Sequence, residues 1–371
     1  MQTGTELIFT RADSAGFTLV ELLIAMALGL SLSAGVMQIY VANSQADRIQ
    51  EAKMRIQETG RFALNFLASE IRMSAYLGCL SKSGIIHNML YQPPASFQVE
   101  RGIQGWEAKS VTAQELVSSS GSHWTSTEGN VLDTTTVMTG TDILRVWNTS
   151  PGAALLDSIS SGAELTAVNS TIAGLANGDI VILNDCYRVD VLQACSVVHS
   201  SEGLGINTEA TVCVPGNDVS KPARSQIDGE LLKLKSALFY IGKRANVAEN
   251  PPALFRRQLN SNAVAGTPEE MLEGIENMQI LYGVNLDNDL QNTVDAYVPA
   301  DQVSAWSSVI SVRLSLLVQS IENNLAVGPQ SYAFDGVLYD GAAGNGSLPS
   351  DRRLRSAFVA TVTLRNRALA Q

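Results

Sequence analysis

A single carboxylate stands near the start of a long apolar stretch. From Phe17 to Ala42 the chain reads FTLVELLIAMALGLSLSAGVMQIYVA, and Glu21 is the one charged side chain in it. An ionisable group in hydrocarbon is costly and is usually paired or functional. The stretch is preceded by Gly16 and by a short polar segment. The type and position of Glu21 therefore indicate a functional carboxylate inside an apolar helix.

The apolar stretch is long enough to cross a membrane. A helix from Phe17 to Ala42 would span about 39 Å, against the ~30 Å hydrocarbon core of a bilayer. Composition alone would fit a plain signal anchor that carries a stray glutamate near its end.

The residues around Gly16 favour a more specific interpretation. Gly16-Phe17-Thr18-Leu19-Val20-Glu21 resembles the processing site of type IV prepilins and pseudopilins. The resemblance implies that a prepilin peptidase cleaves between Gly16 and Phe17 and that the new amine of Phe17 is then N-methylated. It also implies that Glu21 faces the N-terminal amine of a neighbouring subunit and so sets the register of assembly.

Four cysteines follow the apolar stretch: Cys79, Cys186, Cys195 and Cys213. An even number in an exported head suggests disulfides formed in an oxidising compartment. Three connectivities are open, and the short spacing favours Cys186 with Cys195, which leaves Cys79 with Cys213. A zinc site is the alternative, but the chain has neither a CxxC pair nor clustered histidines.

Two further polar clusters are candidate sites. Asp287, Asp289 and Asp295 lie in an oxygen-rich loop that could bind calcium weakly, although it lacks the glycine and glutamate of an EF-hand loop. A solvated acidic turn is the alternative. The C-terminal arginines form a basic cluster that either keeps a strand edge soluble or contacts an acidic neighbour; they are Arg352, Arg353, Arg355, Arg365 and Arg367.

The remaining composition excludes several classes of function. The chain has 371 residues and a formal net charge of −11, which argues against direct nucleic-acid binding. Hydrophobic residues make up 45% and charged residues 16%, proportions that suit a folded protein. No common catalytic motif occurs in its expected context, so we expect neither an enzyme nor a cofactor.

The elements expected to position these residues follow in order. Residues 1–16 form a cleaved leader, 17–42 the membrane and assembly half of a helix, and 43–78 its amphipathic half, which ends at Gly78-Cys79. The amphipathic half carries an apolar stripe at three- and four-residue steps, formed by Ile49, Ala52, Ile56, Ala63, Phe66, Leu67 and Ile71. Gly29, Gly35 and Gly60 are the expected weak points of the continuous helix over 17–77.

Residues 79–371 are predicted to form a periplasmic head dominated by β-strands. Alternating apolar residues predict strands over 310–318 and 354–367, and a hairpin is expected from 234–241 and 253–259. Further strands are expected over 142–147, 178–183, 187–199 and 271–285, and a helical turn over 301–306. One long helix packed on a large antiparallel sheet gives an α+β, pilin-like fold.

The C-terminal half narrows the resemblance. Three stretches resemble the PilW group of type IV minor pilins: Leu281-Tyr282-Gly283-Val284, Trp306 with Val309 and Val312-Arg313, and Thr363-Leu364-Arg365-Asn366-Arg367. The resemblance implies a minor pilin of a priming or tip complex that serves pilus biogenesis, and through it adhesion, twitching motility or DNA uptake. Its expected location is the inner membrane of a Gram-negative bacterium and then the pilus, most simply at the tip, because a bulky head is hard to repeat along a fibre.

The same resemblance implies a set of partners and leaves alternative functions open. The expected partners are other minor pilins, the major pilin, a large tip adhesin, the prepilin peptidase and, before assembly, inner-membrane lipid. A J-type minor pseudopilin of type II secretion shares the leader and the α+β head. A membrane-anchored binding protein and an anchored enzyme are the alternatives from other classes.

Overall fold

A computed structural model describes residues 16, 18–79, 84–94, 97–109, 116–117, 137–160, 164–168, 172, 174–200, 203–208, 213–218, 220–221, 229–244, 251–258, 266–287 and 293–368. The chain divides into two compact units, Met1–Glu51 and Ala52–Gln371. The head lies in the second unit.

One long helix, α1 (Leu19–Met73), begins the described chain. It ends where Ala75 adopts a left-handed backbone with φ 60° and where Gly78 does so again with φ 85°. The N–H of Ala75 then donates to the carbonyl of Trp147 at 2.8 Å, so the chain turns directly into the head. The helix stops a few residues before Gly78-Cys79, the end predicted from the sequence.

The larger of two main sheets has twelve strands. Its path runs β1-β7-β6-β10-β4-β5-β9-β8, with β2, β3, β11 and β12 attached beside it. The strands are β1 (Ile85–Asn88), β2 (Ile103–Ala108), β3 (Leu116–Val117), β4 (Ile143–Ser160), β5 (Glu164–Val168), β6 (Ile180–Asn184), β7 (Arg188–Gln193), β8 (Ser196–Ser200), β9 (Gly203–Asn207), β10 (Glu230–Gly242), β11 (Ala253–Gln258) and β12 (Glu269–Glu273).

The second sheet has four strands in the order β14-β13-β15-β18. These are β13 (Ile275–Val284), β14 (Ala296–Val298), β15 (Val309–Gln319) and β18 (Arg355–Thr363). Between β15 and β18 the chain forms a small hairpin, β16 (Tyr332–Phe334) and β17 (Val337–Tyr339). A short helix, α2 (Arg365–Ala368), follows β18.

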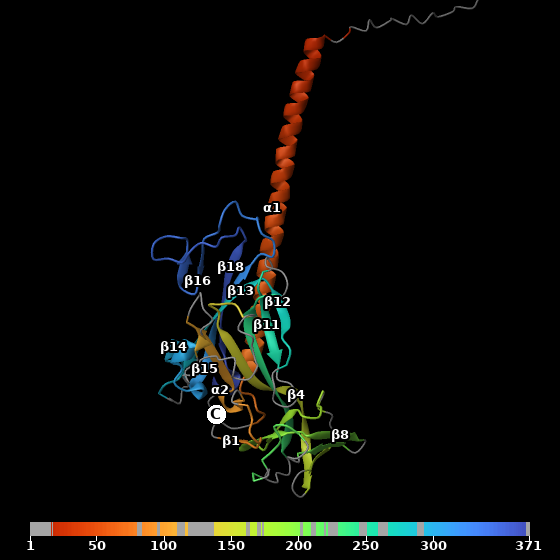
Figure 1. Cartoon of the computed structure of the whole chain (residues 1–371), viewed down its shortest axis with the longest axis vertical. Coiled ribbons are helices and arrows are strands. Elements are labelled where there is room, and N and C mark those ends of the chain that lie inside the picture. The colour runs from red at the N-terminus through yellow and green to blue at the C-terminus, as the bar shows by residue number, and fades with distance from the viewer. Residues whose placement is uncertain are drawn as a thin grey trace, which may run out of the picture. The chain divides into compact units, whose positions relative to one another are not determined.

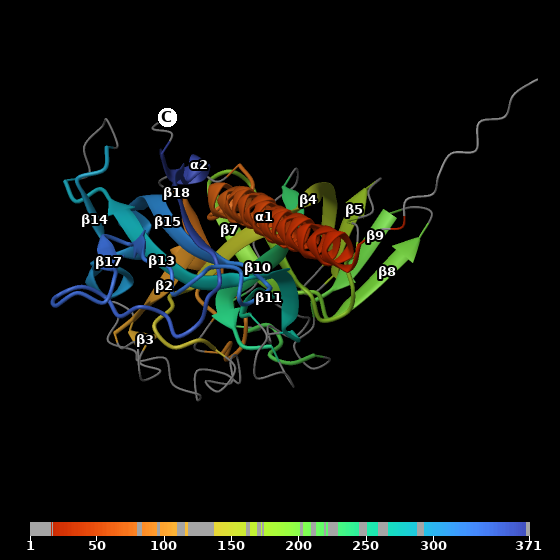
Figure 2. The same cartoon turned by 90° about the horizontal axis from the view of Figure 1, so that it is seen from above.

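Both sheets share one core with the second half of the helix. Ile56, Ala63, Leu67 and Ile71 of α1 pack against apolar side chains of β4 and β10 and of β13, β15 and β18. These are members of the predicted apolar stripe. Figure 2 shows α2 beside the end of α1, where the Asn366 side chain donates to the Ser74 carbonyl.

The part of the head between Leu77 and Leu234 has cores of its own. One includes Leu77, Trp147 and Ile182, and another includes Met89, Leu183 and Leu204. Strand β4 is long enough to belong to both regions. Figure 1 shows the end of β4 with β8 well away from β13, β15 and β18.

The α+β class predicted from the sequence is confirmed, and most predicted strands are present. The expected hairpin is formed by β10 and β11, which pair antiparallel. Several boundaries were wrong. The strand predicted over 142–147 is only the first part of β4, which continues to Ser160, and the segment 271–285 is divided at Gly274 into β12 and β13. The segment 187–199 forms two strands, because the chain breaks at Ala194 and Cys195, and the segment 354–367 is strand only as far as Thr363 before it turns into α2. The turn over 301–306 consists of two short 3-10 segments, Ala300–Gln302 and Trp306–Ser308.

Candidate functional site

The start of α1 is closed by a capping box formed by Thr18 and Glu21. The Glu21 N–H donates to Thr18 Oγ1 at 3.3 Å, and Glu21 Oε2 accepts from the Thr18 N–H at 3.1 Å. The Thr18 hydroxyl lies 3.1 Å from the same oxygen. Each side chain thus satisfies a backbone donor that the first helical turn leaves open. The carboxylate also stands at the positive end of the helix dipole.

The first part of α1 presents apolar side chains outward all along its length. Leu23, Leu30 and Ile39 are 56%, 71% and 64% exposed. The helix is long enough and apolar enough to cross a membrane, and none of its most apolar part is buried inside the protein. Exposed apolar surface on this scale needs lipid or other helices to cover it.

The three helix glycines differ in their surroundings. A Cβ built on Gly29 or Gly35 meets nothing within 4 Å, so both lie on open helix surface. A Cβ on Gly60 would approach the ring of Phe358 to 2.4 Å. Gly60 is therefore a packing position at which β18 comes close to the helix, and its cost in helix propensity is offset there by tertiary contact.

The four cysteines form two disulfides, with partners other than those predicted. Cys79 pairs with Cys186, and Cys195 pairs with Cys213. The predicted Cys186–Cys195 link is wrong because these residues stand at opposite ends of β7. Its six residues hold them roughly 20 Å apart, far beyond disulfide reach.

The Cys79–Cys186 disulfide fixes the end of the α1 segment to the turn between β6 and β7. Its Cα atoms lie 4.7 Å apart, with a sequence separation of 107. Gly78 sits directly against Asn184, since a Cβ on Gly78 would lie 2.3 Å from the Asn184 side-chain nitrogen. The Cys195–Cys213 disulfide closes a separation of 18 residues near the other end of β7. Both links stabilise the region between 77 and 234.

A buried carboxylate joins the two sheets. Asp142 is 2% exposed; one of its oxygens accepts from the N–H of Ala108 at 2.9 Å, and the other accepts from the N–H of Ile280 at 2.8 Å. The N–H of Asp142 itself donates to the Met278 carbonyl. Burial raises the pKa of Asp142, and the nearby charge of Glu107 raises it further.

Glu107 belongs to β2 and lies close to the Asp142 carboxylate. Burial raises the pKa of Glu107 to about 7, with the charges of Asp301 and Asp335 acting in the same direction. Its Oε2 is buried and has no hydrogen-bond partner among the described residues. Lys109 forms an ion pair with Asp301 at the rim of this acidic group.

The predicted basic cluster is mostly internal. Arg355 is 6% exposed and pairs with Glu276 and Asp351 at 2.7 Å each. Arg353 donates to the carbonyl of Ser320 at 2.8 Å. Arg367 donates to the carbonyls of Trp306 and Arg101. The solvated-edge interpretation is therefore wrong for these three residues, because the 320–354 excursion and the 3-10 segments fold over them. Arg352 and Arg365 remain exposed.

The structure describes only part of the proposed calcium loop. Asp289 lies outside the described residues, as does Phe17 at the N-terminus. Asp295 accepts from the N–H of Leu286 at 2.6 Å, so it closes a turn. Among the described residues, no three histidine, cysteine or acidic side chains come together as a metal site.

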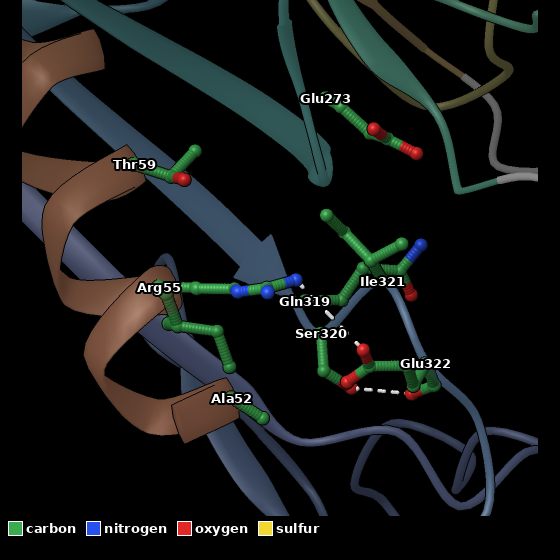
Figure 3. A pocket seen from close by; sticks show the side chains of 9 residues that line it. Ala52, Arg55, Thr59, Glu273, Gln319, Ser320, Ile321 and Glu322 are labelled. Atoms are coloured by element: carbon green, nitrogen blue, oxygen red, sulfur yellow. Dashed lines mark hydrogen bonds and ion pairs between the residues drawn. The ribbon is translucent and has the colours of Figure 1, made fainter. Parts of the chain in front are cut away.

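A shallow pocket lies between the second half of α1 and the end of β15 (Figure 3). Its empty volume is about 280 Å³, part of which is open to solvent, and Arg55 and Glu322 form an ion pair at 3.8 Å across it. Both side chains are about half exposed, so the pair contributes little to stability. Nothing in the pocket resembles a catalytic arrangement.

Sequence reasoning overlooked three of these features. The capping box was readable, because Thr18-x-x-Glu21 is its signature. The roles of Asp142 and Arg367 were not readable, because their partners come from distant strands. No sequence pattern distinguishes them from exposed residues of the same type.

Comparisons with known proteins agree with the motifs. Residues 238–366 match the family model described as type IV pilus-assembly protein W, and residues 11–37 match the prokaryotic N-terminal methylation motif. No curated protein matches the chain. A solved type IV-like pilin from Thermus thermophilus aligns over 85% of this chain and 99% of its own, with 12% identity and a TM-score of 0.31. The two sequence matches confirm the resemblance found at both ends: the chain carries a prokaryotic N-terminal methylation motif near its start and a PilW region in its C-terminal part.

Proposed function

We propose that this protein is a minor pilin that assembles with other minor pilins and the major pilin into a priming or tip complex for pilus biogenesis. A prepilin peptidase would remove residues 1–16 by cleaving between Gly16 and Phe17, and the Phe17 amine would then be methylated. Residues 17–42 would span the inner membrane of a Gram-negative bacterium before assembly. Residues 43–78 would continue the helix, and 79–371 would form the periplasmic head.

One observation carries this proposal: an outward-facing apolar helix that begins with a capped carboxylate directly after Gly16-Phe17. In the filament the same apolar surface would be covered by equivalent helices of neighbouring subunits. Glu21 would there exchange its local cap for the Phe17 amine of a neighbour. Charge-assisted hydrogen bonds of this kind are stronger than neutral ones and are strengthened further away from water.

The size of the head favours a position in the pilus that only a few copies of the protein occupy. The region between Leu77 and Leu234 adds two apolar cores and both disulfides to the part that matches the PilW model. That region lies where α1 ends, at the end of the head opposite the start of the second unit. It is therefore suited to contact a large adhesin at the tip. The PilW match over 238–366 is the reason to propose a pilus ahead of a type II secretion system.

The capping box allows the role of the Glu21 charge to be tested separately from helix capping. Glu21→Gln keeps a side-chain oxygen that can cap the helix but removes the charge, whereas Thr18→Val keeps the charge and removes the hydroxyl of the cap. We expect both variants to be cleaved after Gly16. Only Glu21→Gln should be lost from purified pili, measured by immunoblot against the membrane fraction.

The outcomes separate the two roles. Normal incorporation of Glu21→Gln would refute the pairing with the Phe17 amine. Loss of both variants would assign the defect to the cap. N-terminal sequencing with mass analysis of the mature chain should find a methylated Phe17 as the first residue, and another first residue would place the cleavage site elsewhere.

A further inference from the structure

Strand β18 leaves one side of the four-stranded sheet open. It is the last strand in the order β14-β13-β15-β18 and pairs with β15 from Gln319↔Arg355 to Ser311↔Thr363 without a bulge. Within the described part of the chain, no strand pairs with its other side. Natural proteins usually protect such an edge with a charge, a proline, a bulge or a covering loop.

The hydrogen bonds at its two ends fix which residues face the open side. The N–H of Ser320 donates to the Leu354 carbonyl at 2.8 Å, and the N–H of Leu364 donates to the Ile310 carbonyl at 2.9 Å. Even-numbered residues therefore exchange hydrogen bonds with β15, since paired positions alternate along an antiparallel ladder. The odd-numbered residues from Arg355 to Thr363 turn their N–H and C=O groups toward the open side.

A side chain already takes the place of a strand at the first of these positions. The N–H of Arg355 donates to Gln330 Oε1 at 2.8 Å, and Gln330 Nε2 donates back to the Arg355 carbonyl at 3.4 Å. This amide reproduces the pair of hydrogen bonds that a neighbouring strand would make. The positions that follow it are Ala357, Val359, Thr361 and Thr363, all exposed and uncharged.

The core beneath this edge is also incompletely covered. Phe358 of β18 and Leu64 of α1 pack against the main core but stay partly exposed. An additional strand beside β18 would bury more of both. The edge therefore offers apolar surface as well as unpaired backbone groups.

Positive charge lies on the part of α1 next to the edge and just past the end of β18. Arg61, Leu64, Ala68 and Arg72 fall on one stripe of α1, because residues three, four, seven and eleven positions apart share a helix face. The contact of Gly60 with Phe358 places β18 next to this stripe. The opposite flank of the helix faces β4 and β10.

The contacts of that opposite flank establish which face of α1 is turned toward β4 and β10. Glu70 lies 3.5 Å from Asn148 of β4, and Phe66 packs edge-on against Phe239 of β10. Arg61 and Arg72 are exposed, and Arg365 is exposed just beyond the end of β18. A ligand at the edge would therefore meet three cations around an uncharged strand.

We propose that the open edge of β18 binds an extended segment of a different protein of the same assembly by β-strand addition. The segment has uncharged, β-branched residues at its centre and acidic residues beside them. Main-chain hydrogen bonds supply affinity in this mode of recognition, and alternate side chains supply specificity. The inference rests on the proposed function, because it places the partner in the pilin assembly.

An antiparallel pair of two copies of this chain does not fit the edge. Two β18 strands paired antiparallel would be related by a twofold axis through the extended sheet. The parts of the two α1 helices that pack on one face of that sheet would then run in opposite directions, which two subunits anchored in one membrane do not do. We therefore assign the edge to a different protein, and the cross-linking below tests a second copy directly.

Site-specific cross-linking in the bacterium that makes the protein tests this geometry on the full chain at native level. A photoreactive phenylalanine analogue is placed in turn at Ala357, Val359 and Thr361, and cross-linked peptides from the pilus fraction are mapped by mass spectrometry. We expect the three positions to react with one segment of one protein, at residues that advance by two for each step along β18, with acidic residues nearby. The same analogue at Tyr187, which is 79% exposed in the turn between β6 and β7, is the control and should not capture that segment.

Proline variants test independently whether the outward N–H groups of β18 bind the segment. Val359→Pro removes an outward N–H that β15 does not use, and edge strands tolerate such a proline. It should keep the melting temperature close to that of the wild type but reduce the cross-link from Thr361 at least tenfold. Ala360→Pro, which removes a hydrogen bond to β15, should instead lower the melting temperature. Val359→Asp keeps the backbone N–H and should weaken the cross-link from Thr361, because the new carboxylate repels the acidic residues of the segment; this variant replaces Val359→Pro if the proline variant does not fold.

Several results would overturn the proposal. They are cross-links to a second copy of this chain, contacts without two-residue spacing, or no cross-link while the protein is present in pili. Absence of the protein from pili would instead refute the proposed function. Capture of a properly spaced segment in the membrane fraction would then still support strand addition.

Discussion

Glu107 should make the stability of the head depend on pH, and Glu107→Gln should remove much of that dependence. Burial raises the pKa of Glu107 from its ordinary value of 4.5 to about 7. Between these values the folded protein holds a proton that the unfolded chain releases. The contribution of Glu107 to the free energy of unfolding is therefore fully present below pH 4.5, and it is lost as the pH rises through 7.

The size of the effect follows from the shift. At ~1.4 kcal/mol per pKa unit, the full change is about 3 kcal/mol. Glu107 is only partly buried, and solvent screens part of the interaction, so we expect about 1–2 kcal/mol. The raised pKa of Asp142 acts in the same direction, so some dependence should persist in the variant.

Urea unfolding of the full chain in detergent micelles, followed by tryptophan fluorescence at pH 5, 6, 7 and 8, measures this directly. Trp106 neighbours Glu107 on β2 and is 2% exposed, so its emission should report the opening of this region. Between pH 5 and pH 8 the wild type should lose about 1–2 kcal/mol, Glu107→Gln clearly less, and the control Glu100→Gln as much as the wild type. Equal slopes for Glu107→Gln and the wild type would refute the reasoning.

Three further predictions follow from packing and covalent links. Gly60→Ala should lower the melting temperature despite its better helix propensity, because its Cβ would press on the Phe358 ring; Phe358→Leu in the same chain should recover part of the loss. Arg367→Met should cost about 1–3 kcal/mol in urea unfolding by removing the guanidinium donor to the Arg101 and Trp306 carbonyls, of which the Trp306 carbonyl keeps the N–H of Val309; a loss below 0.5 kcal/mol would contradict that role. Peptide mapping without reduction should recover Cys79 joined to Cys186, and a peptide joining Cys186 to Cys195 would contradict the disulfides described here.

The sequence by itself determined the parts of this protein that depend on local pattern. The capped apolar helix, the boundary at Gly16 and the amphipathic continuation are each readable within one segment, because a helix places residues three and four apart on one face. The alternation over 310–318 predicted β15, and the alternation over 354–364 predicted β18, for the same reason with a period of two. Both family resemblances also rest on contiguous residues.

Tertiary structure decided the features that join distant segments. Cys79 and Cys186 are 107 residues apart and meet because the segment after α1 packs against Asn184 at the turn between β6 and β7, while β7 carries Cys195 away from Cys186. Arg355 and Arg367 look like surface charges in the sequence and are internal because loops fold over them. The open edge of β18 is likewise a property of strand order. A pattern within one segment records which face of an element is apolar, but it does not record which element lies beside it.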